Sequence, residues 1–362
     1  MTLMQRIGFD IPLVQAPMAG TSTPAMAAAV SNAGALGSIA VGATDAAGAR
    51  AMIAEVHERT GRPFNVNLFV HRTPVADAER EAGWLDWLRA LFVEFGAEPP
   101  AALTSPYTSF ADDTEMLALL VETAPPVVSF HFGLPGAEAI AALRARGVML
   151  LATATSLDEA RALEAAGIDA VVAQGIEAGG HRGMFDPAAP DAQLGTMALT
   201  RLLVRQGGLP VIAAGGIMDG AGIAAALDLG AQAAQLGTAF VACPESAADD
   251  AYRAALMSPA AFRTTLTPLV SGRPARALAN RFTALSAQVG DRRMPDYPIA
   301  YHAGKALNAA AKARGEHGFG AQWAGQGAPL ARAMPAAELV TTLAAELAAA
   351  RTAAHADGAS TG

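Results

Sequence analysis

The sequence predicts an α/β fold of the (β/α)8 or TIM barrel type, in which eight parallel strands alternate with helices. Short apolar runs alternate along the 362 residues with alanine-rich segments of helical length. Each run is apolar almost throughout, as expected for strands that are buried on both faces. With 52% hydrophobic and 16% charged residues, the chain can bury a large core.

Eight apolar runs are the predicted strands, and they lie at residues 11–15, 36–40, 64–69, 127–130, 148–153, 170–173, 210–214 and 233–236. Helices are predicted between them, for example over residues 23–33, 156–166 and 220–229, each followed by a glycine. A glycine there suits the left-handed C-cap that ends a helix before the next strand. Ser156 and Glu159 also have the spacing of a capping box at a helix N-terminus.

Two stretches are longer than a barrel requires. Residues 73–124 separate the third and fourth strands and contain Trp84, Trp87 and Tyr107. The stretch after the eighth strand is expected to form a helical lid that covers the substrate. The expected division of the chain is a barrel over residues 1–243, the lid over 244–325, a C-terminal helix over 326–352 that returns to the barrel, and a flexible tail over 353–362.

The amino-acid composition indicates which binding partners and which cellular compartment to expect. The net charge is −8 and there is no run of lysine and arginine, so neither nucleic acid nor a membrane surface is an expected partner. The single cysteine, Cys243, leaves no internal disulfide and indicates a reducing cytoplasm. Residues 11–44 carry no charge, but prolines and glycines interrupt them, so we expect a buried strand–helix–strand unit. We expect a monomer or a homodimer.

The loop after the sixth strand, QGIEAGGHRG at residues 174–183, is the most informative segment. Its four glycines, Gly179 and Gly180 among them, let the backbone approach a ligand closely. His181 has the side chain best suited to proton transfer or hydrogen bonding near neutral pH. In a barrel, the carboxyl ends of the strands carry the active site. The alternative is a tight turn with an incidental histidine.

Glycine-rich turns also follow the seventh and eighth strands and favour a phosphate site. The residues are Gly215 and Gly216 in the first turn, and Gln235, Leu236, Gly237 and Thr238 in the second. Each turn is expected to open a helix, whose backbone N–H groups and dipole would bind the anion. Ordinary packing of helix on strand is the alternative, although it does not account for a second matching turn.

Polar side chains at other strand ends suit a flat heterocycle such as an isoalloxazine ring. Asn67 and Gln174 offer amide groups toward the barrel centre, and Ala16, Pro17 and Met18 follow the first strand, where Pro17 and Met18 offer a flat apolar surface. His131 ends the fourth strand and faces either the same cavity or the core. Satisfied polar groups at strand ends are the alternative for both amides.

The predicted lid contains Tyr297, Tyr301 and Lys305, at i, i+4 and i+8. In a helix these side chains share one face, and two phenols with an ammonium suit a small anion such as a carboxylate. An exposed amphipathic helix is the alternative. The seven histidines show no HxxxH or HxH spacing, so no metal site is expected.

These motifs resemble the class I nitronate monooxygenases, formerly called 2-nitropropane dioxygenases, over nearly the whole chain. The segments are QAPMAG (15–20), FNVNLF (64–69), VSFHFGLP (128–135), the His181 loop, AAGGI (213–217), QLGT (235–238), YPIAYHAGK (297–305) and WAGQG (323–327). The GIEAGGH stretch alone is shared with FMN-dependent enoyl-ACP reductases and NADH:quinone reductases. The lid motif and the chain length favour class I.

The resemblance implies an FMN enzyme without metal. It implies that Asn67, Gln174, Gly179, Gly216 and 235–238 bind FMN and that His181 is the active-site histidine. It also implies that Tyr107, Tyr297, Tyr301 and Lys305 line the substrate pocket. The expected reaction is oxidation of an alkyl nitronate, propionate 3-nitronate above all, by O2. Two alternatives stay open: an NAD(P)H-dependent flavin reductase of quinones or enoyl thioesters, and a barrel that binds a phosphorylated ligand without redox chemistry.

Overall fold

The computed structural model describes residues 1–359 and confirms the predicted barrel. Its parallel sheet has the order β1-β9-β8-β6-β5-β4-β3-β2. The two outer strands of this order also meet, because Val14 and Leu36 form a parallel bridge that closes the barrel. The strands are β1 (Leu13–Gln15), β2 (Gly37–Ala40), β3 (Phe64–Phe69), β4 (Val127–His131), β5 (Met149–Ala154), β6 (Ala170–Gln174), β8 (Val211–Ala214) and β9 (Ala233–Leu236).

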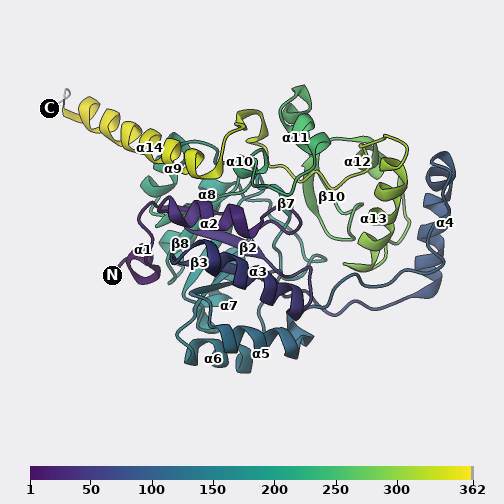
Figure 1. Cartoon of the computed structure of the whole chain (residues 1–362), viewed down its shortest axis with the longest axis horizontal. Helices are drawn as coiled ribbons and strands as arrows, with labels where there is room; N and C mark the ends of the chain where they lie inside the picture. Colours follow the sequence, from purple (N-terminus) through teal and green to yellow (C-terminus); the bar gives the residue numbers. More distant parts are fainter. Residues whose placement is uncertain (360–362) are drawn as a thin grey trace.

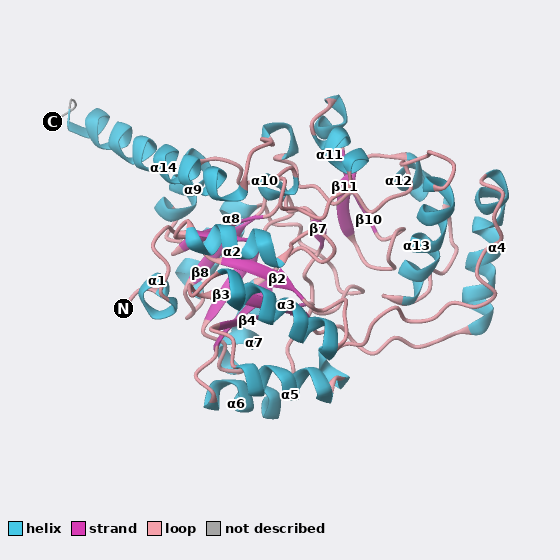
Figure 2. Cartoon of the chain, in the orientation of Figure 1, coloured by secondary structure: helices cyan, strands magenta, loops and turns pink. Residues whose placement is uncertain are grey.

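Helices surround this sheet, as Figures 1 and 2 show. They are α2 (Pro24–Asn32), α3 (Ala46–Arg59), α5 (Thr114–Thr123), α6 (Ala137–Ala145), α7 (Leu157–Ala165), α8 (Thr196–Gln206), α9 (Gly220–Asp228) and the short α10 (Thr238–Val241). Ser156 caps α7 as predicted, since its hydroxyl accepts from the backbone N–H of Glu159. The predicted capping box is wrong, however, because the Glu159 carboxylate bonds Thr155 instead of Ser156.

An unpredicted helix closes the amino end of the barrel. Thr2 and Gln5 form a capping box that starts α1 (Leu3–Ile7). The buried side chains of Leu3 and Ile7 belong to one cluster with Val14 and with Leu151 inside the barrel. Apolar burial at this end leaves the opposite, carboxyl end of the barrel for polar groups.

A second layer covers the carboxyl end, and we call it the cap (Figure 1). Its helices are α4 (Ala78–Glu94), α11 (Asp250–Leu256), α12 (Arg281–Ala284) and α13 (Ile299–Lys312), with the 3-10 helices η2 (Pro259–Phe262) and η3 (Leu285–Gln288). The 3-10 helix η1 (Phe110–Asp112) packs on the barrel instead, since Phe110 is in the core cluster that contains Phe130. The long stretch after β3 contributes α4, whose Trp84 packs in one cluster with Leu307 of α13. Two separate insertions therefore build one cap.

The cap is not purely helical, which corrects the expectation for residues 244–325. Strands β10 (Thr264–Thr267) and β11 (Ala275–Leu278) form an antiparallel sheet with β7 (Gly180–His181). His181 lies opposite Ala275 in this sheet. Backbone pairing between β7 and β11 thus fixes the position of the His181 loop relative to the cap. No periodic pattern in the sequence predicted this pairing.

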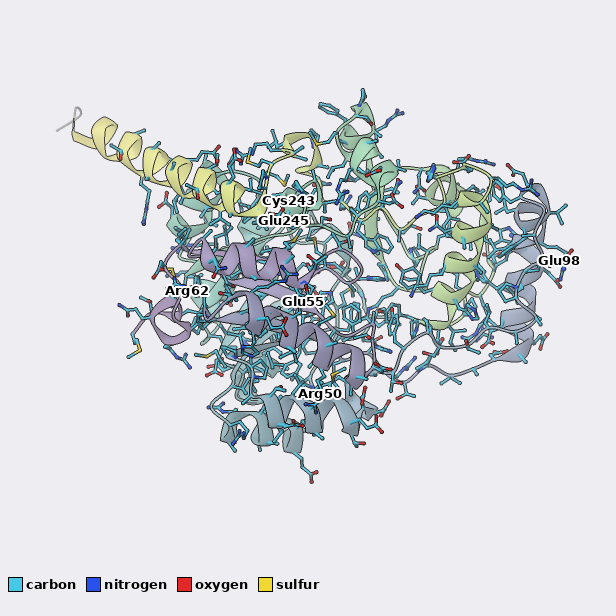
Figure 3. The ribbon with its side chains drawn as sticks, viewed as in Figure 1. Arg50, Glu55, Arg62, Glu98, Cys243 and Glu245 are labelled. Carbon is cyan, nitrogen blue, oxygen red and sulfur yellow. The ribbon has the colours of Figure 1, made fainter. Side chains whose placement is uncertain are left out.

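The C-terminal segment returns to the barrel through η4 (Ala328–Leu330) and α14 (Ala336–Ala359). Leu339 and Leu343 of α14 pack in one cluster with Met26 of α2 and Ile223 of α9. The Glu245 carboxylate accepts from the first N–H of α14, near the buried Cys243 (Figure 3). The helix extends past the predicted end at residue 352, and residues 360–362 of the predicted tail lie outside the described residues. No helix among residues 1–359 is both long and apolar enough to span a bilayer.

We predict that Gly37→Ala will strongly destabilise the fold. A Cβ atom on Gly37 would lie 1.9 Å from the carbonyl oxygen of Ala27, so β2 and α2 would have to separate. Overpacking typically lowers the free energy of unfolding by about 1–3 kcal/mol, and we expect the upper end here because the clash is with backbone. A Cβ on Gly61 meets nothing within 4 Å, so Gly61→Ala is the matched control. Urea denaturation should show a large loss for Gly37→Ala only; equal midpoints would contradict this packing.

Candidate active site

A cavity of about 390 Å3 lies between the carboxyl ends of the strands and the cap. It brings together nearly all the residues predicted from the sequence. Those that line it are Ala16, Pro17, Met18, Asn67, Tyr107, His131, Gln174, Gly179, Gly180, His181, Gly215, Gly216, Gln235, Gly237, Thr238, Tyr301 and Lys305. Leu236 and Tyr297 do not line the cavity.

Both exceptions have a local structural reason. Leu236 is buried in the cluster that contains Met26, because adjacent strand residues point to opposite faces and Gln235 takes the cavity side. Tyr297 precedes α13, so only Tyr301 and Lys305 share the predicted helix face. The Tyr297 hydroxyl instead lies 2.6 Å from the Tyr107 hydroxyl and supports that lining residue from behind.

Gln174 and His131 hold the His181 loop in place. Gln174 Nε2 donates to the His181 carbonyl at 2.9 Å, and its Oε1 accepts from the Gly183 N–H at 2.7 Å. His131 Nε2 also bonds the His181 carbonyl, at 3.2 Å, and must donate there because a carbonyl only accepts. Its Nδ1 then accepts from the Thr153 hydroxyl at 3.0 Å. Both ends of the Gln174 amide, predicted to face a ligand, are therefore engaged by the chain itself.

Asn67 has its amide nitrogen engaged in the same way. Its Nδ2 donates to the hydroxyl of Ser129 at 2.9 Å and to the carbonyl of Ser129 at 3.2 Å. These bonds fix the orientation of the side chain, and within the described chain they leave Oδ1 as its open hydrogen-bonding atom.

The His181 imidazole lies among aromatic rings. Ring centroids of Trp323, Tyr297 and Phe132 lie 5.1, 5.3 and 5.6 Å away. Burial in this setting lowers the pKa of His181 to about 3, and the charges of His131 and Arg273 add to the effect. The imidazole is therefore neutral near pH 7. Its Nε2 lies 2.9 Å from the hydroxyl of Ser271, a cap residue.

Lys305 supplies a cation on the cap side of the cavity. Its Nζ lies 4.8 Å from the ring centroid of Tyr301 and 5.5 Å from that of Tyr107. Burial lowers the pKa of Lys305 and raises the pKa of Tyr301 to about 12, so both phenols stay neutral. Within residues 1–359 no carboxylate forms an ion pair with Lys305. One ammonium thus faces the cavity without a counter-charge.

The glycine turns differ in detail from the prediction. Helix α9 begins at Gly220, not directly after Gly216, and α10 has only four residues. The Thr238 hydroxyl accepts from the Gly325 N–H at 3.0 Å. In the described part of the chain, however, the backbone N–H groups of Gly216 and Gly237 have no acceptor. These open donors fit an anionic group better than the two predicted helix N-termini do.

Sequence reasoning missed several residues of this site, notably Ser271, Arg273 and Trp323. All three come from the cap, far from any barrel strand end, so an inventory of strand ends could not include them. Arg273 is almost fully buried, and its guanidinium lies 4.3 Å from the Phe132 ring centroid. Because arginine is rarely buried, nothing in the sequence predicted that Arg273 would lie inside the protein beside the site. Only WAGQG, in the family resemblance, pointed to Trp323.

The buried histidines predict that acid destabilises the protein. Burial lowers the pKa of His71 and His131 to about 4, below the value near 6.5 in an unfolded chain. Between these values the unfolded chain binds more protons, so the free energy of unfolding falls as pH falls below 6.5. The slope is about 1.4 kcal/mol per pH unit for each such histidine.

Thermal unfolding measured from pH 8 to pH 5 checks this. We expect a flat melting temperature above pH 7 and a steep decrease below 6.5. His71→Asn should reduce the slope, whereas the exposed His57→Asn should not. A melting temperature that is constant down to pH 5 would show that these histidines do not titrate with unfolding.

Comparison with known proteins agrees with this architecture. The family model described as nitronate monooxygenase matches residues 2–346. A nitronate monooxygenase of Paraburkholderia phytofirmans is 62% identical, with 95% of this chain and 94% of that protein covered. One of Pseudomonas aeruginosa is 59% identical, with 94% and 97% covered.

Among solved structures, the nitroalkane oxidase of Streptomyces ansochromogenes is 44% identical, with a TM-score of 0.88 and with 97% of this chain and 99% of that chain covered. Fold and sequence similarity thus agree over nearly the whole length. The chain is an enzyme, an oxidoreductase, and belongs to the nitronate monooxygenase family.

Proposed function

We propose that this enzyme uses bound FMN to oxidise alkyl nitronates with O2, giving a carbonyl product with nitrite or nitrate. Propionate 3-nitronate is the proposed substrate. The observation that carries the proposal is that one cavity is lined by a neutral His181 and by the Lys305 ammonium, which has no ion-pair partner in the part of the chain that the structure describes. In a substrate that has both groups, the nitronate would bind to His181 and the carboxylate would bind to Lys305.

FMN fits the barrel side of this cavity. The open N–H groups of Gly216 and Gly237 suit its phosphate. Asn67 offers an acceptor to the edge of the ring, and Pro17 and Met18 offer a flat apolar surface. Gln174 would act mainly through the loop that it holds, because both ends of its amide are engaged. A flavin on the barrel side leaves the cap side for substrate.

The side chains then have distinct tasks. FMN, when bound, supplies the electron chemistry between the nitronate and O2. His181 donates a hydrogen bond to the nitronate oxygens, or would act as the base for a neutral nitroalkane. Lys305, with the Tyr301 and Tyr107 hydroxyls, holds the substrate carboxylate. Trp323 and the ring of Phe132 keep the space around His181 apolar, which strengthens each of these contacts.

Oxygen uptake by the purified protein tests the proposal. The protein should be yellow and should release FMN on denaturation. Propionate 3-nitronate should give rapid O2 uptake, and NADH should give little. Anaerobic bleaching of the flavin by NADH, with nitronate inert, would instead assign the chain to the flavin reductases. A colourless protein that binds no flavin would overturn both readings.

A further inference from the structure

We infer that Glu177 and Thr196 are positioning residues for the flavin phosphate, because together they hold the turn of Gly215 and Gly216 in the shape that presents its open N–H group. The inference rests on the proposed function, since it takes FMN as the cofactor. Both glycines line the cavity, whereas neither Glu177 nor Thr196 does. The two side chains therefore act through the turn and do not touch the phosphate.

The turn after β8 needs support from outside itself. Gly215 has a φ of 128° and Gly216 a φ of 70°, both in the left-handed region that favours glycine. Two successive glycines have many accessible conformations, so holding them in one shape costs more conformational entropy than it does for other residues. Contacts that order the turn before the flavin arrives remove this cost from binding.

The Glu177 carboxylate provides a fixed point beside this turn by capping α8. Gly195, which precedes α8, has no side chain that could cap the helix. Both carboxylate oxygens of Glu177 take that place, because the Thr196 N–H donates to Oε1 at 2.9 Å and to Oε2 at 2.8 Å. A negative charge at a helix N-terminus is favourable. The helix dipole also partly balances this charge, which reduces its repulsion of a phosphate at the neighbouring turn.

Thr196 connects the capped helix to the turn. Its hydroxyl lies 2.9 Å from Glu177 Oε2 and 3.0 Å from the Gly215 carbonyl oxygen, while the Ala214 carbonyl oxygen is farther away, at 3.4 Å. An ionised carboxylate and a carbonyl only accept, so the one hydroxyl proton serves these oxygens in turn. The stem of Glu177 supports the second glycine, since a Cβ atom on Gly216 would lie only 3.3 Å from Glu177 Cβ. The two side chains thus contact both glycines of the turn.

The backbone of Glu177 is held independently of its carboxylate. Its carbonyl oxygen accepts from the Gln326 N–H at 2.9 Å. The same segment approaches the turn, because a Cβ atom on Gly327 would lie 2.7 Å from the Gly216 carbonyl oxygen. A change in the carboxylate or in the Thr196 hydroxyl therefore tests the support of the turn and leaves this backbone contact in place.

Titration of the full-length protein, freed of bound flavin, with FMN and with riboflavin tests the inference. Riboflavin has the same ring system but no phosphate. Thr196→Val removes the hydroxyl and keeps the N–H that Glu177 accepts from. We expect the Kd for FMN to rise about tenfold, the effect of one lost hydrogen bond, and the Kd for riboflavin to change by less than about twofold. Glu177→Gln should shift the two Kd values in the same pattern, and Thr196→Ser, which keeps the hydroxyl, should bind FMN like wild type.

Glu159→Gln is the matched control. The Glu159 carboxylate also accepts from the N–H and the hydroxyl of one threonine, Thr155, at 2.6 and 2.7 Å, but this threonine follows β5. Both Kd values should stay at the wild-type level in this variant. Melting temperatures of the flavin-free proteins will show that each variant is folded.

The outcomes separate this inference from the proposed function. If Thr196→Val weakened FMN and riboflavin equally, the two residues would support the cavity as a whole, and an unchanged Kd for FMN would mean that the turn needs no support from them. Either result would overturn the inference while FMN binding by wild type stands. A wild-type protein that binds neither flavin would overturn the proposed function and this inference with it.

Phosphorus-31 NMR of the flavin-loaded protein gives a readout that does not depend on affinity. The resonance of the bound phosphate reports on the N–H groups around it. We expect Thr196→Val to shift or broaden this resonance and Glu159→Gln to reproduce the wild-type signal. An identical resonance in wild type and Thr196→Val would show that the turn keeps its shape without the hydroxyl, against the inference.

Discussion

Replacement of His181 by asparagine is expected to lower kcat/KM for propionate 3-nitronate by about 10²- to 10⁴-fold, the usual contribution of a positioned acid, base or donor. The flavin should stay bound. His181 is held through its backbone by Gln174 and His131, and these bonds do not involve its imidazole. The substitution therefore removes the ring without dismantling the loop.

Stopped-flow reduction of the flavin by nitronate under anaerobic conditions is the measurement of choice, because it separates substrate binding from later steps. His57→Asn is the matched control, since His57 is exposed on α3 and does not line the cavity. If His181→Asn retained FMN and reduced it at the wild-type rate, the assignment of His181 to the reaction would be wrong. Loss of flavin would instead assign the histidine a part in cofactor binding.

The barrel could be predicted from sequence because its signals are local. Each strand is a short apolar run, and recurring glycines mark the helix ends. Once the strands are known, their carboxyl ends must converge, so Asn67, His131 and Gln235 could be placed around one cavity before any coordinates. Leu236 shows that a motif does not predict the direction of each side chain. It is part of the QLGT motif, but adjacent residues of a strand point to opposite faces, so its side chain lies in the core.

Hydrogen-bond partners could not be predicted, because they depend on segments distant in sequence. Gln174 was expected to face a ligand, but its amide bonds the His181 loop. The Thr238 hydroxyl is likewise engaged by the backbone of Gly325. Ser271 and Arg273 reach the site only because β11 pairs with β7, a pairing between a two-residue strand and an insertion that follows the barrel. Neither strand has enough residues for a periodic signal.

Replacement of Lys305 by methionine is expected to raise the KM for propionate 3-nitronate about 10- to 100-fold, as for loss of a charge-assisted hydrogen bond. Methionine keeps an unbranched stem, so it removes the charge with little loss of packing. The chain contains only two lysines, Lys305 and Lys312, both on α13. Lys312 forms an ion pair with Asp249, whereas Lys305 faces the cavity without an ion-pair partner among the described residues.

The informative comparison is between two substrates that differ in the carboxylate. Ethyl nitronate has no carboxylate, so its KM should change less than threefold in Lys305→Met if the ammonium binds that group. Lys312→Met removes an ammonium from the same helix and should leave both KM values unchanged. An equal increase in KM for the two substrates would mean that Lys305 contacts the nitronate group instead of the carboxylate. Lys305 and His181 would then both bind the nitronate. A selective increase for propionate 3-nitronate would mean that the cap recognises the carboxylate while the barrel loop recognises the nitronate.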